Sequence, residues 1–263
     1  MKLRTVVLSL LGAIIISGVV AGFFLPSIMA ALTVIPANQQ AATTPNVAKQ
    51  TQNTPLPGQT PTPTMPATTT GKPVAQDNFQ RADQSLWGTA SDGQNWQGAA
   101  NQSQSFSIAN KAGLIQGQGF FDTTLGGQQA DAEILFTSSL SSFQQANIGA
   151  VLRWHDPNNW YKAYLDGQKL IILRKIQGVV TRLSDFNFPA TPNTSYDLRF
   201  QVAGNNLAAK VWRHGATEPA NWMVIAQDHS LTTGQGGIRA FIQPGITIKV
   251  QAFLEDTMIM PPK

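Results

Sequence analysis

Residues 77–257 are predicted to form an all-β domain, and three features of the sequence support this fold class. In the run 196–202 every second residue is large and apolar and the residues between are polar, and other runs alternate similarly. Turn-forming pairs such as Asp166-Gly167 and Pro244-Gly245 separate the runs. No stretch of this region shows apolar residues at helical spacing. Many short strands at such spacing predict two antiparallel sheets packed as a jelly-roll sandwich.

The expected strands follow from alternation and from the turn residues between them. They are placed at 148–154, 160–165, 169–175, 179–183, 196–202, 207–211, 223–227, 237–242 and 246–254. Gly204-Asn205-Asn206 is expected to join two of them as a hairpin. Gly234-Gln235-Gly236-Gly237 is expected to be a further hairpin turn, because its glycine spacing fits no phosphate-binding loop.

An apolar segment precedes this domain. Residues 5–25 are uncharged and mostly apolar, and they follow Lys2 and Arg4. Such a run is long enough to cross a membrane as a helix, and the basic residues hold its amino-terminal side in the cytoplasm. Residues 1–37 are therefore expected to be an uncleaved signal-anchor helix that tethers an extracytoplasmic domain. The alternative is a cleaved signal peptide and a secreted protein.

Residues 38–76 are expected to be a disordered linker. This stretch consists almost entirely of Thr, Pro, Gln, Ala and Asn, and it has too few large apolar residues to form a core. Its prolines favour extended conformations that would hold the domain away from the membrane. Residues 258–263 are expected to be a frayed tail. The chain has no cysteine, so disulfides cannot stabilise the domain.

The net charge of +4 does not indicate nucleic-acid binding. All 14 acidic residues lie at or after Asp77, whereas four of the 18 basic residues, Lys2, Arg4, Lys49 and Lys72, precede it. From Asp77 onward the chain therefore has 14 basic and 14 acidic side chains and is neutral. It lacks the excess of basic residues that phosphate contacts require, so no nucleic-acid partner is expected.

Several short motifs resemble those of a known class of domain. They are Asp77-Asn-Phe-Gln-Arg81, Trp87-Gly88, Asp92-Gly-Gln-Asn-Trp96, Arg153-Trp-His-Asp-Pro-Asn-Asn-Trp-Tyr161, Leu165-Asp-Gly167, Val211-Trp-Arg-His-Gly215, Glu218-Pro-Ala-Asn-Trp222 and Phe253-Leu-Glu-Asp256. Together they resemble concanavalin A-like lectin/glucanase domains, also called LamG-like jelly rolls, of exported bacterial proteins. That resemblance implies a jelly-roll fold and relatives that include glycan-binding modules, laminin-type adhesion modules, glucanases and domains called keto-disaccharide hydrolases. Fold alone does not determine which of these functions applies.

A catalytic site is not expected. The glucanases of this class use a Glu-x-Asp-x-x-Glu strand, in which two carboxylates flank the scissile bond. This chain has only Asp131-Ala132-Glu133, and Phe136 occupies the position of the third acid. Its three histidines are scattered, without the spacing of a zinc site or a catalytic triad. We therefore assign no catalytic residues from the sequence.

A glycan-binding surface is the leading functional expectation. Sugar rings pack on aromatic faces, while charged and amide groups fix their orientation. If the alternation is in register, the outward residues include the candidates Arg153, Trp160, Lys162, Tyr164 and Trp212. Three aromatic rings among basic residues predict a platform for polysaccharide or another envelope glycan. In the alternative interpretation, the tryptophans cap the sandwich and long basic side chains cover them.

Calcium is considered as a structural ion. In relatives the first and last strands lie side by side and often hold an ion, and Asp77 and Asp256 match those places. The alternative is a pair of capping acids without an ion, because calcium prefers six or more oxygen ligands. The sequence thus predicts an extracytoplasmic carbohydrate-binding module without catalysis. A glycoside hydrolase of the same fold and a structural or adhesive surface protein are the alternatives.

Overall fold

The structure, a computed structural model, describes residues 69–259. The expected signal-anchor helix at 1–37 lies outside the described residues, as do linker residues 38–68 and tail residues 260–263. Within the described range no helix is long and apolar enough to cross a membrane. The one helical element there is the short 3-10 turn η1 (Ala99–Asn101). This part of the chain is therefore all-β.

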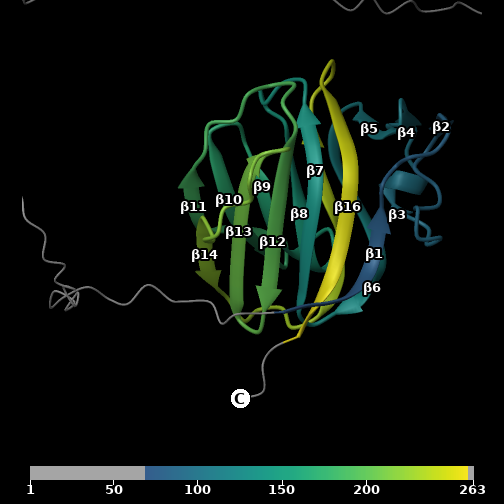
Figure 1. The fold of residues 1–263 in the computed structure, drawn as a ribbon. Helices are drawn as coiled ribbons and strands as arrows, with labels where there is room; N and C mark the ends of the chain where they lie inside the picture. The colour runs from purple at the N-terminus through teal and green to yellow at the C-terminus, as the bar shows by residue number, and fades with distance from the viewer. Residues whose placement is uncertain (1–68, 260–263) are drawn as a thin grey trace, which may run out of the picture. The chain divides into compact units, whose positions relative to one another are not determined.

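Two antiparallel sheets make up the fold (Figure 1). The first sheet contains, in spatial order, β14 (Val224–Gln227), β13 (Asn206–Arg213), β12 (Tyr196–Ala203), β7 (Ala132–Leu140), β16 (Thr247–Ile259), β5 (Ala112–Gln116), β4 (Phe106–Ala109) and β2 (Gln84–Ser85). A ninth strand, β1 (Thr69–Asp77), pairs with the second half of β16, whose first half pairs with β5. The last strand is thereby held between β7 on one side and β5 and β1 on the other.

The second sheet packs against the first. It contains, in spatial order, β11 (Val179–Asn187), β10 (Lys169–Ile176), β9 (Asn159–Leu165), β8 (Asn147–Asp156), β15 (Gly234–Ile242), β6 (Gly119–Gln129) and β3 (Gln97–Gly98). In Figure 1 the first sheet, with β12, β13, β7 and β16, faces the viewer, and β8, β9 and β10 lie behind it. The predicted two-sheet sandwich is confirmed for this region.

The core lies between the sheets because alternate residues of each strand point inward. On β9, Tyr161, Ala163 and Leu165 belong to the buried core, as the alternation predicts. At one end of the sandwich the core is aromatic, and the ring centroids of Trp87 and Trp96 lie 4.9 Å apart in an edge-to-face contact. These tryptophans come from the motifs that carry the family resemblance, so those motifs serve packing.

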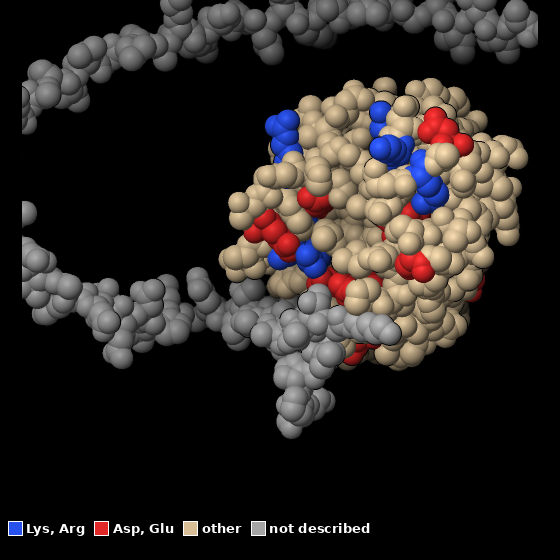
Figure 2. All heavy atoms as spheres, turned by 45° about the vertical axis from the view of Figure 1, so that its right-hand side comes forward, with Lys and Arg blue, Asp and Glu red and all other residues tan. Residues whose placement is uncertain are grey.

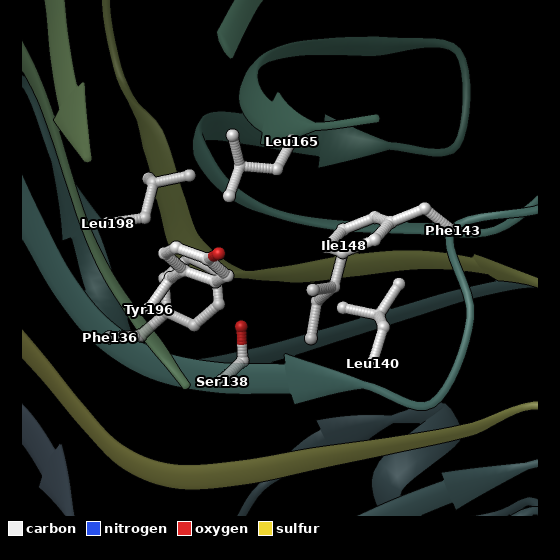
Figure 3. Close-up of a pocket in the computed structure, with 8 residues that line it drawn as sticks. All are labelled: Phe136, Ser138, Leu140, Phe143, Ile148, Leu165, Tyr196 and Leu198. Atoms are coloured by element: carbon white, nitrogen blue, oxygen red, sulfur yellow. The ribbon is translucent and has the colours of Figure 1, made fainter. Parts of the chain in front are cut away.

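A small cavity remains inside the sandwich (Figure 3). It is lined by Phe136, Ser138, Leu140, Phe143, Ile148, Leu165, Tyr196 and Leu198. Its volume of about 10 Å³ is close to the minimum for one water molecule. The Tyr196 hydroxyl already accepts a hydrogen bond of 2.8 Å from the Thr191 backbone N–H. This cavity is therefore a packing defect of the core and too small for an organic ligand.

Three expectations about chain segments need correction. The frayed tail was expected to begin at residue 258, but β16 continues to Ile259, and the Met258 backbone N–H donates to the Asp131 carbonyl at 3.1 Å. The linker was expected to run to residue 76, but β1 begins at Thr69, because its backbone completes the exposed edge of β16. The sequence around Gly234–Gly237 was expected to be a turn, but it belongs to β15 and contains a β-bulge. A Cβ atom at Gly237 would overlap the Thr123 carbonyl, and one at Gly236 would overlap the Glu255 carboxyl. These glycines therefore permit close packing within and between the sheets.

Candidate functional site

A surface hollow of about 370 Å³ lies on the outer face of the second sheet. We call it the outer hollow, and it is lined by Phe120, Asn147, Trp160, Lys162, Tyr164, Leu173, Lys175, Val180, Arg239 and Phe241. These side chains come from five strands, β6, β8, β9, β10 and β15, and from the edge strand β11. A hollow of this volume is within the size range of small-molecule binding sites.

Strand alternation brings three of the sequence candidates into this hollow. Because Tyr161, Ala163 and Leu165 point into the core, Trp160, Lys162 and Tyr164 point to the outer face. The neighbouring strand β8 has a glycine beside them. A Cβ atom at Gly149 would lie 2.8 Å from Cε of Lys162. The glycine therefore leaves room for the lysine stem to lie against the sheet.

An aromatic pair forms one wall of the outer hollow. The rings of Phe120 on β6 and Phe241 on β15 stack with centroids 4.5 Å apart. Phe120 is 65% exposed. The exposed edge valine Val180 lies across the hollow on β11. The hollow thus has apolar surface on both sides and one ring that is open to a ligand.

Arg239 connects this aromatic wall with the centre of the hollow. Its guanidinium carbon lies 5.0 Å from the ring centroid of Phe120 and 5.1 Å from that of Trp160. The guanidinium also forms a salt bridge with Asp122 on β6. Trp160 is consequently only 3% exposed, and its indole N–H donates to the Pro157 carbonyl at 3.1 Å. Trp160 forms the floor of the hollow and offers no free ring face, contrary to its expected place in the platform.

Lys162 lies at the centre of the outer hollow. Its ammonium donates a hydrogen bond of 2.6 Å to Oδ1 of Asn147 and lies 4.6 Å from the ring centroid of Tyr164. The residue is only 5% exposed, and no described carboxylate is within ion-pair distance of it. Burial, together with repulsion from Arg239, lowers the pKa of Lys162 to about 7, and attraction to Asp122 opposes the shift.

Arg153 does not join this group, although it was a candidate. It lies at a bulge of β8 with a positive φ of 49° and is buried. Its guanidinium donates to the backbone carbonyls of Ala130, Leu231 and Gly204 and to the carboxylate of Asp131. All of these acceptors lie in loops or turns at one end of the sandwich. Arg153 therefore ties loops together, because the bulge breaks the alternation that predicted an outward side chain.

Trp212 does not join the outer hollow either, because β13 belongs to the first sheet. It is 8% exposed and pairs in register with Asp197 on β12. On the same sheet Arg199 forms salt bridges with Glu133 and Glu218, and Lys210 forms one with Glu218. The expected single platform of three aromatic residues is therefore split between opposite faces of the sandwich.

Several residues of the outer hollow were not identified from the sequence. They include Phe120, Asn147, Phe241 and the nearby Asp122. Strand β6 contains Gly119, Gly126 and Gly127, which obscure its alternation. The signal that could have found it is the pair Phe120-Phe121, because adjacent aromatic residues on a strand must point to opposite faces.

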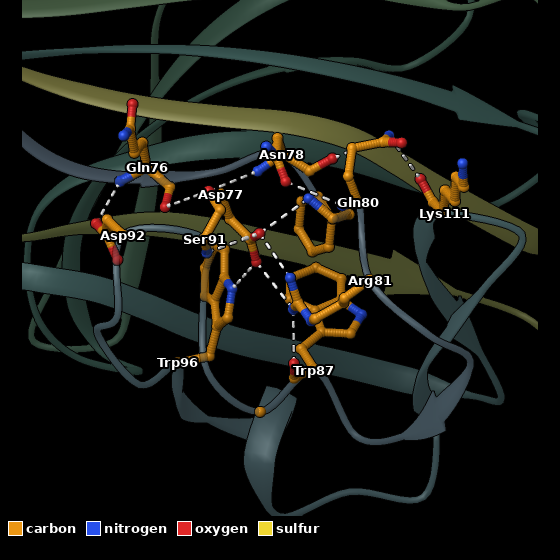
Figure 4. A network of polar contacts seen from close by, with 12 residues as sticks. Gln76, Asp77, Asn78, Gln80, Arg81, Trp87, Ser91, Asp92, Trp96 and Lys111 are labelled. Atoms are coloured by element: carbon orange, nitrogen blue, oxygen red, sulfur yellow. Dashed lines mark hydrogen bonds and ion pairs between the residues drawn. The ribbon is translucent and has the colours of Figure 1, made fainter.

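Asp77, a candidate calcium ligand, has no free oxygen for an ion (Figure 4). Its carboxylate accepts two hydrogen bonds from the Arg81 guanidinium and one of 2.7 Å from the Trp96 indole N–H. It also accepts from the backbone N–H groups of Phe79 and Ser91. These five donors use both oxygens. The carboxylate therefore holds the first loop onto the aromatic end of the core, which is the reason for its place in the opening motif.

Asp256, the other calcium candidate, does not lie opposite Asp77. Strands β1 and β16 are adjacent, as expected, but their register places Asp77 opposite Phe253 and Asp256 opposite Pro73. No group of three or more potential metal ligands occurs in residues 69–259. Burial raises the pKa of Asp256 and of its register neighbour Glu133, although the nearby Arg199 opposes the shift in both cases. Asp77 and Asp256, the two calcium candidates, are thus not brought together as ligands of one ion.

Asp131 and Glu133, the acids considered for catalysis, do not share a groove. Asp131 precedes β7 and accepts hydrogen bonds from Arg153 and from the backbone N–H of Gly204. Glu133 lies on β7 and pairs with Arg199. Figure 2 shows that charged side chains are scattered among uncharged ones on the visible face, without a continuous basic stripe. Asp131 and Glu133 are thus each engaged by an arginine and form no carboxylate pair of the glucanase kind, and the face seen in Figure 2 has no continuous basic surface for phosphate.

Comparison with known proteins supports the fold. No protein-family model matches the chain, and no curated protein matches it either. Among solved structures, the carbohydrate-binding module CBM66 from Bacillus subtilis is similar, with a TM-score of 0.52 and 13% identity over 62% of this chain and 95% of that one. The GH43 protein BlXynB from Bacillus licheniformis has a TM-score of 0.52 and 15% identity over 70% of this chain but only 39% of its own.

A third similar structure is more distant. The exoplasmic/lumenal domain of VIP36 in its Ca²⁺/Man3GlcNAc-bound form has a TM-score of 0.47 and 10% identity, over 65% of this chain and 86% of that one. At these identities the likenesses show the fold alone. The described domain is thus a jelly-roll sandwich of the kind found in a carbohydrate-binding module and in part of a GH43 protein.

Proposed function

We propose that this protein is a carbohydrate-binding module and that the outer hollow is its glycan-binding site. The observation that carries the proposal is the combination of an exposed aromatic ring, Phe120, with convergent polar groups on one sheet face. The ring can pack on the apolar face of a sugar, while Lys162, Asn147 and Arg239 can hydrogen-bond its hydroxyls. The fold shared with CBM66 is consistent with this proposal.

The proposal is for binding without catalysis. None of the described residues that line the outer hollow is an Asp or a Glu. The nearby Asp122 is held in a salt bridge with Arg239. Glycoside hydrolysis usually needs two carboxylates across the scissile bond, one of them free to act as a base or nucleophile. The composition of the hollow therefore favours a binding module over a hydrolase of the same fold.

We propose further that the domain works outside the membrane, on a glycan of the cell envelope or its surroundings. The support is the apolar run at 5–25 with Lys2 and Arg4 before it, followed by a polar, proline-rich stretch. The amino-terminal segment would then tether the domain, or its cleavage would release it. Protease treatment of intact cells would distinguish an outside domain, which is degraded, from an inside one, which is protected.

The decisive experiment for glycan binding uses the full-length protein in mild detergent on a polysaccharide and glycan array. The test variant is Phe120→Ala, which removes an exposed ring with little effect on the core. Its matched control is Phe186→Ala, because Phe186 is also exposed but does not line the outer hollow. A loss of roughly 1.5–3 kcal/mol of binding free energy, the range for burial of a Phe side chain, is expected for the first variant only.

Two outcomes would contradict the proposal. Binding that both variants retain would place the site elsewhere on the domain. If the folded protein binds no glycan on the array, the outer hollow becomes a protein-contact surface and the adhesive alternative replaces the lectin-like one. Near-native melting temperatures for both variants are needed before either result is interpreted.

A further inference from the structure

Lys162 is a buried cation without a counter-ion, and it lies in a hollow that is open to ligands. Its ammonium has three N–H groups, and among the described residues only the Asn147 side-chain oxygen accepts from it. Buried charges in proteins are normally paired, because transfer from water without a partner is costly. An unpaired buried ammonium beside an accessible surface is therefore evidence for a ligand that supplies the missing negative charge.

The other charges around the outer hollow do not compensate Lys162. Asp122, from β6, is engaged by Arg239, from β15. Lys175, from β10, also lines the hollow and donates to the Pro157 carbonyl at 2.9 Å. Tyr164, the remaining titratable group there, lies under the ammonium, and burial raises the pKa of its hydroxyl, so it is neutral near pH 7. The outer hollow thus has three cationic side chains, those of Lys162, Arg239 and Lys175. The one nearby carboxylate, that of Asp122, is already paired with Arg239.

Asn147 provides a second donor beside the ammonium. A lysine can only donate, so the amide atom that faces Lys162 must be the oxygen. The amide nitrogen is bonded to the same carbon and donates to no other described residue, so it is available to a ligand. Adjacent N–H groups from Lys162 and Asn147 match the two oxygens of a planar carboxylate.

We propose that the outer hollow selects glycans that carry a carboxylate, such as uronic-acid polymers, through the Lys162–Asn147 pair. This inference rests on the proposed glycan-binding function and specifies its ligand class. The carboxylate binds at Lys162, and the sugar ring that bears it packs against Phe120. Arg239 and Lys175 add a positive potential that attracts the polymer.

Binding should depend on pH in a defined direction. Only the protonated amine attracts a carboxylate, and burial and Arg239 lower the pKa of Lys162 to about 7 in the free protein. The protonated fraction then falls about 30-fold between pH 6 and pH 8.5, and the affinity for a carboxylated glycan should fall by a similar factor. A neutral glycan should show no such change.

The test compares three polymers with the full-length protein at constant ionic strength. These are polygalacturonate, dextran sulfate and neutral dextran, each titrated at pH 6 and pH 8.5. Lys162→Met keeps most of the stem and removes the charge, and Lys169→Met is the control because Lys169 pairs with Asp185 outside the hollow. Lys162→Met is expected to weaken polygalacturonate binding at least tenfold and to abolish its pH dependence, and Lys169→Met to change neither.

A second readout does not depend on a variant that folds. Acylation of Lys162 by acetic anhydride, followed by mass spectrometry across pH 5–10, reports the pKa of the amine directly. Free galacturonate should raise that pKa and slow the acylation of Lys162, with no effect at Lys169. Absence of protection by galacturonate would overturn the carboxylate site.

The outcomes separate this inference from the proposed function. Glycan binding that Phe120→Ala removes and Lys162→Met leaves intact would keep the glycan site and overturn carboxylate recognition. Protection of Lys162 by galacturonate without binding of any polymer would keep the anion site and overturn the glycan-binding function. Equal or tighter binding of dextran sulfate, lost in Lys162→Met, would overturn the preference for carboxylate over sulfate.

Discussion

Substitution of Glu255 by glutamine is expected to flatten the pH dependence of stability between pH 4.5 and pH 8. Glu255 lies on β16 with 0% exposure, and its side chain points toward Gly236 of the opposite sheet. Neither carboxyl oxygen has a hydrogen-bond partner among the described residues. Burial, with repulsion from Asp256 as the second cause, raises the pKa of Glu255 from an ordinary 4.5 to about 8.

The sign and size of the effect follow from proton linkage. Between pH 4.5 and pH 8 the unfolded chain loses the Glu255 proton while the folded protein keeps it. The free energy of unfolding therefore falls as pH rises, by about 1.4 kcal/mol per pH unit. Over the window this is at most on the order of 5 kcal/mol, comparable with the whole stability of many domains. Below pH 4.5 the stabilisation is complete, and above pH 8 it is lost.

The assay is urea denaturation of the full-length protein and the Glu255→Gln variant at pH steps from 4.5 to 9. The difference between their free energies of unfolding isolates Glu255 from other groups, such as Lys162, whose lowered pKa stabilises the fold as pH rises above about 7. The control is Glu218→Gln. In the wild-type protein the hydrogen bonds and ion pairs of Glu218 with Lys210 and Arg199 outweigh desolvation and lower the pKa of Glu218. Glu218 therefore adds no slope above pH 5 to the plot of unfolding free energy against pH. Parallel profiles for wild type and Glu255→Gln would refute the assigned burial.

Two further predictions concern the candidates that the structure places outside the hollow. Trp212→Ala should lower the free energy of unfolding by roughly 3 kcal/mol, because the side chain is largely buried, and should leave glycan affinity unchanged. A tenfold loss of affinity in a folded variant would show that the first sheet takes part in binding. Removal of calcium with EDTA should not shift the melting temperature, whereas Asp77→Asn should destabilise by roughly 3 kcal/mol through loss of the Arg81 salt bridge. Calcium-dependent melting of several degrees would contradict the assignment of Asp77 to protein donors.

Much of the second half of the domain could be predicted from the sequence. The expected strand 160–165 corresponds to β9, and the expected hairpin 196–211 to β12 and β13. In these segments the inward residues are large and apolar and the turns contain glycine or asparagine, so the signal is local. The strands of the first half are harder to predict from the sequence. Strands such as β6 contain several glycines, and β1 has little alternation of apolar and polar residues.

The candidate site was partly predictable for the same reason. Alternation on one strand correctly groups Trp160, Lys162 and Tyr164 on the outer face. It cannot show that Arg239 covers Trp160 or that Phe120 and Asn147 lie beside Lys162, because those contacts join strands far apart in the chain. It also fails at Arg153, where a single bulge turns the side chain into the loops.

The sequence by itself determined the all-β class, the neutral charge of the domain and the alternation of its later strands, since these depend on composition and near neighbours. Tertiary structure decided which outward residues share a face. Trp212 and Trp160 have similar local patterns, yet strand order assigns them to opposite sheets. Only the packed sandwich leaves Lys162 buried without a counter-ion and Glu255 buried without a partner, because burial results from the assembly of both sheets.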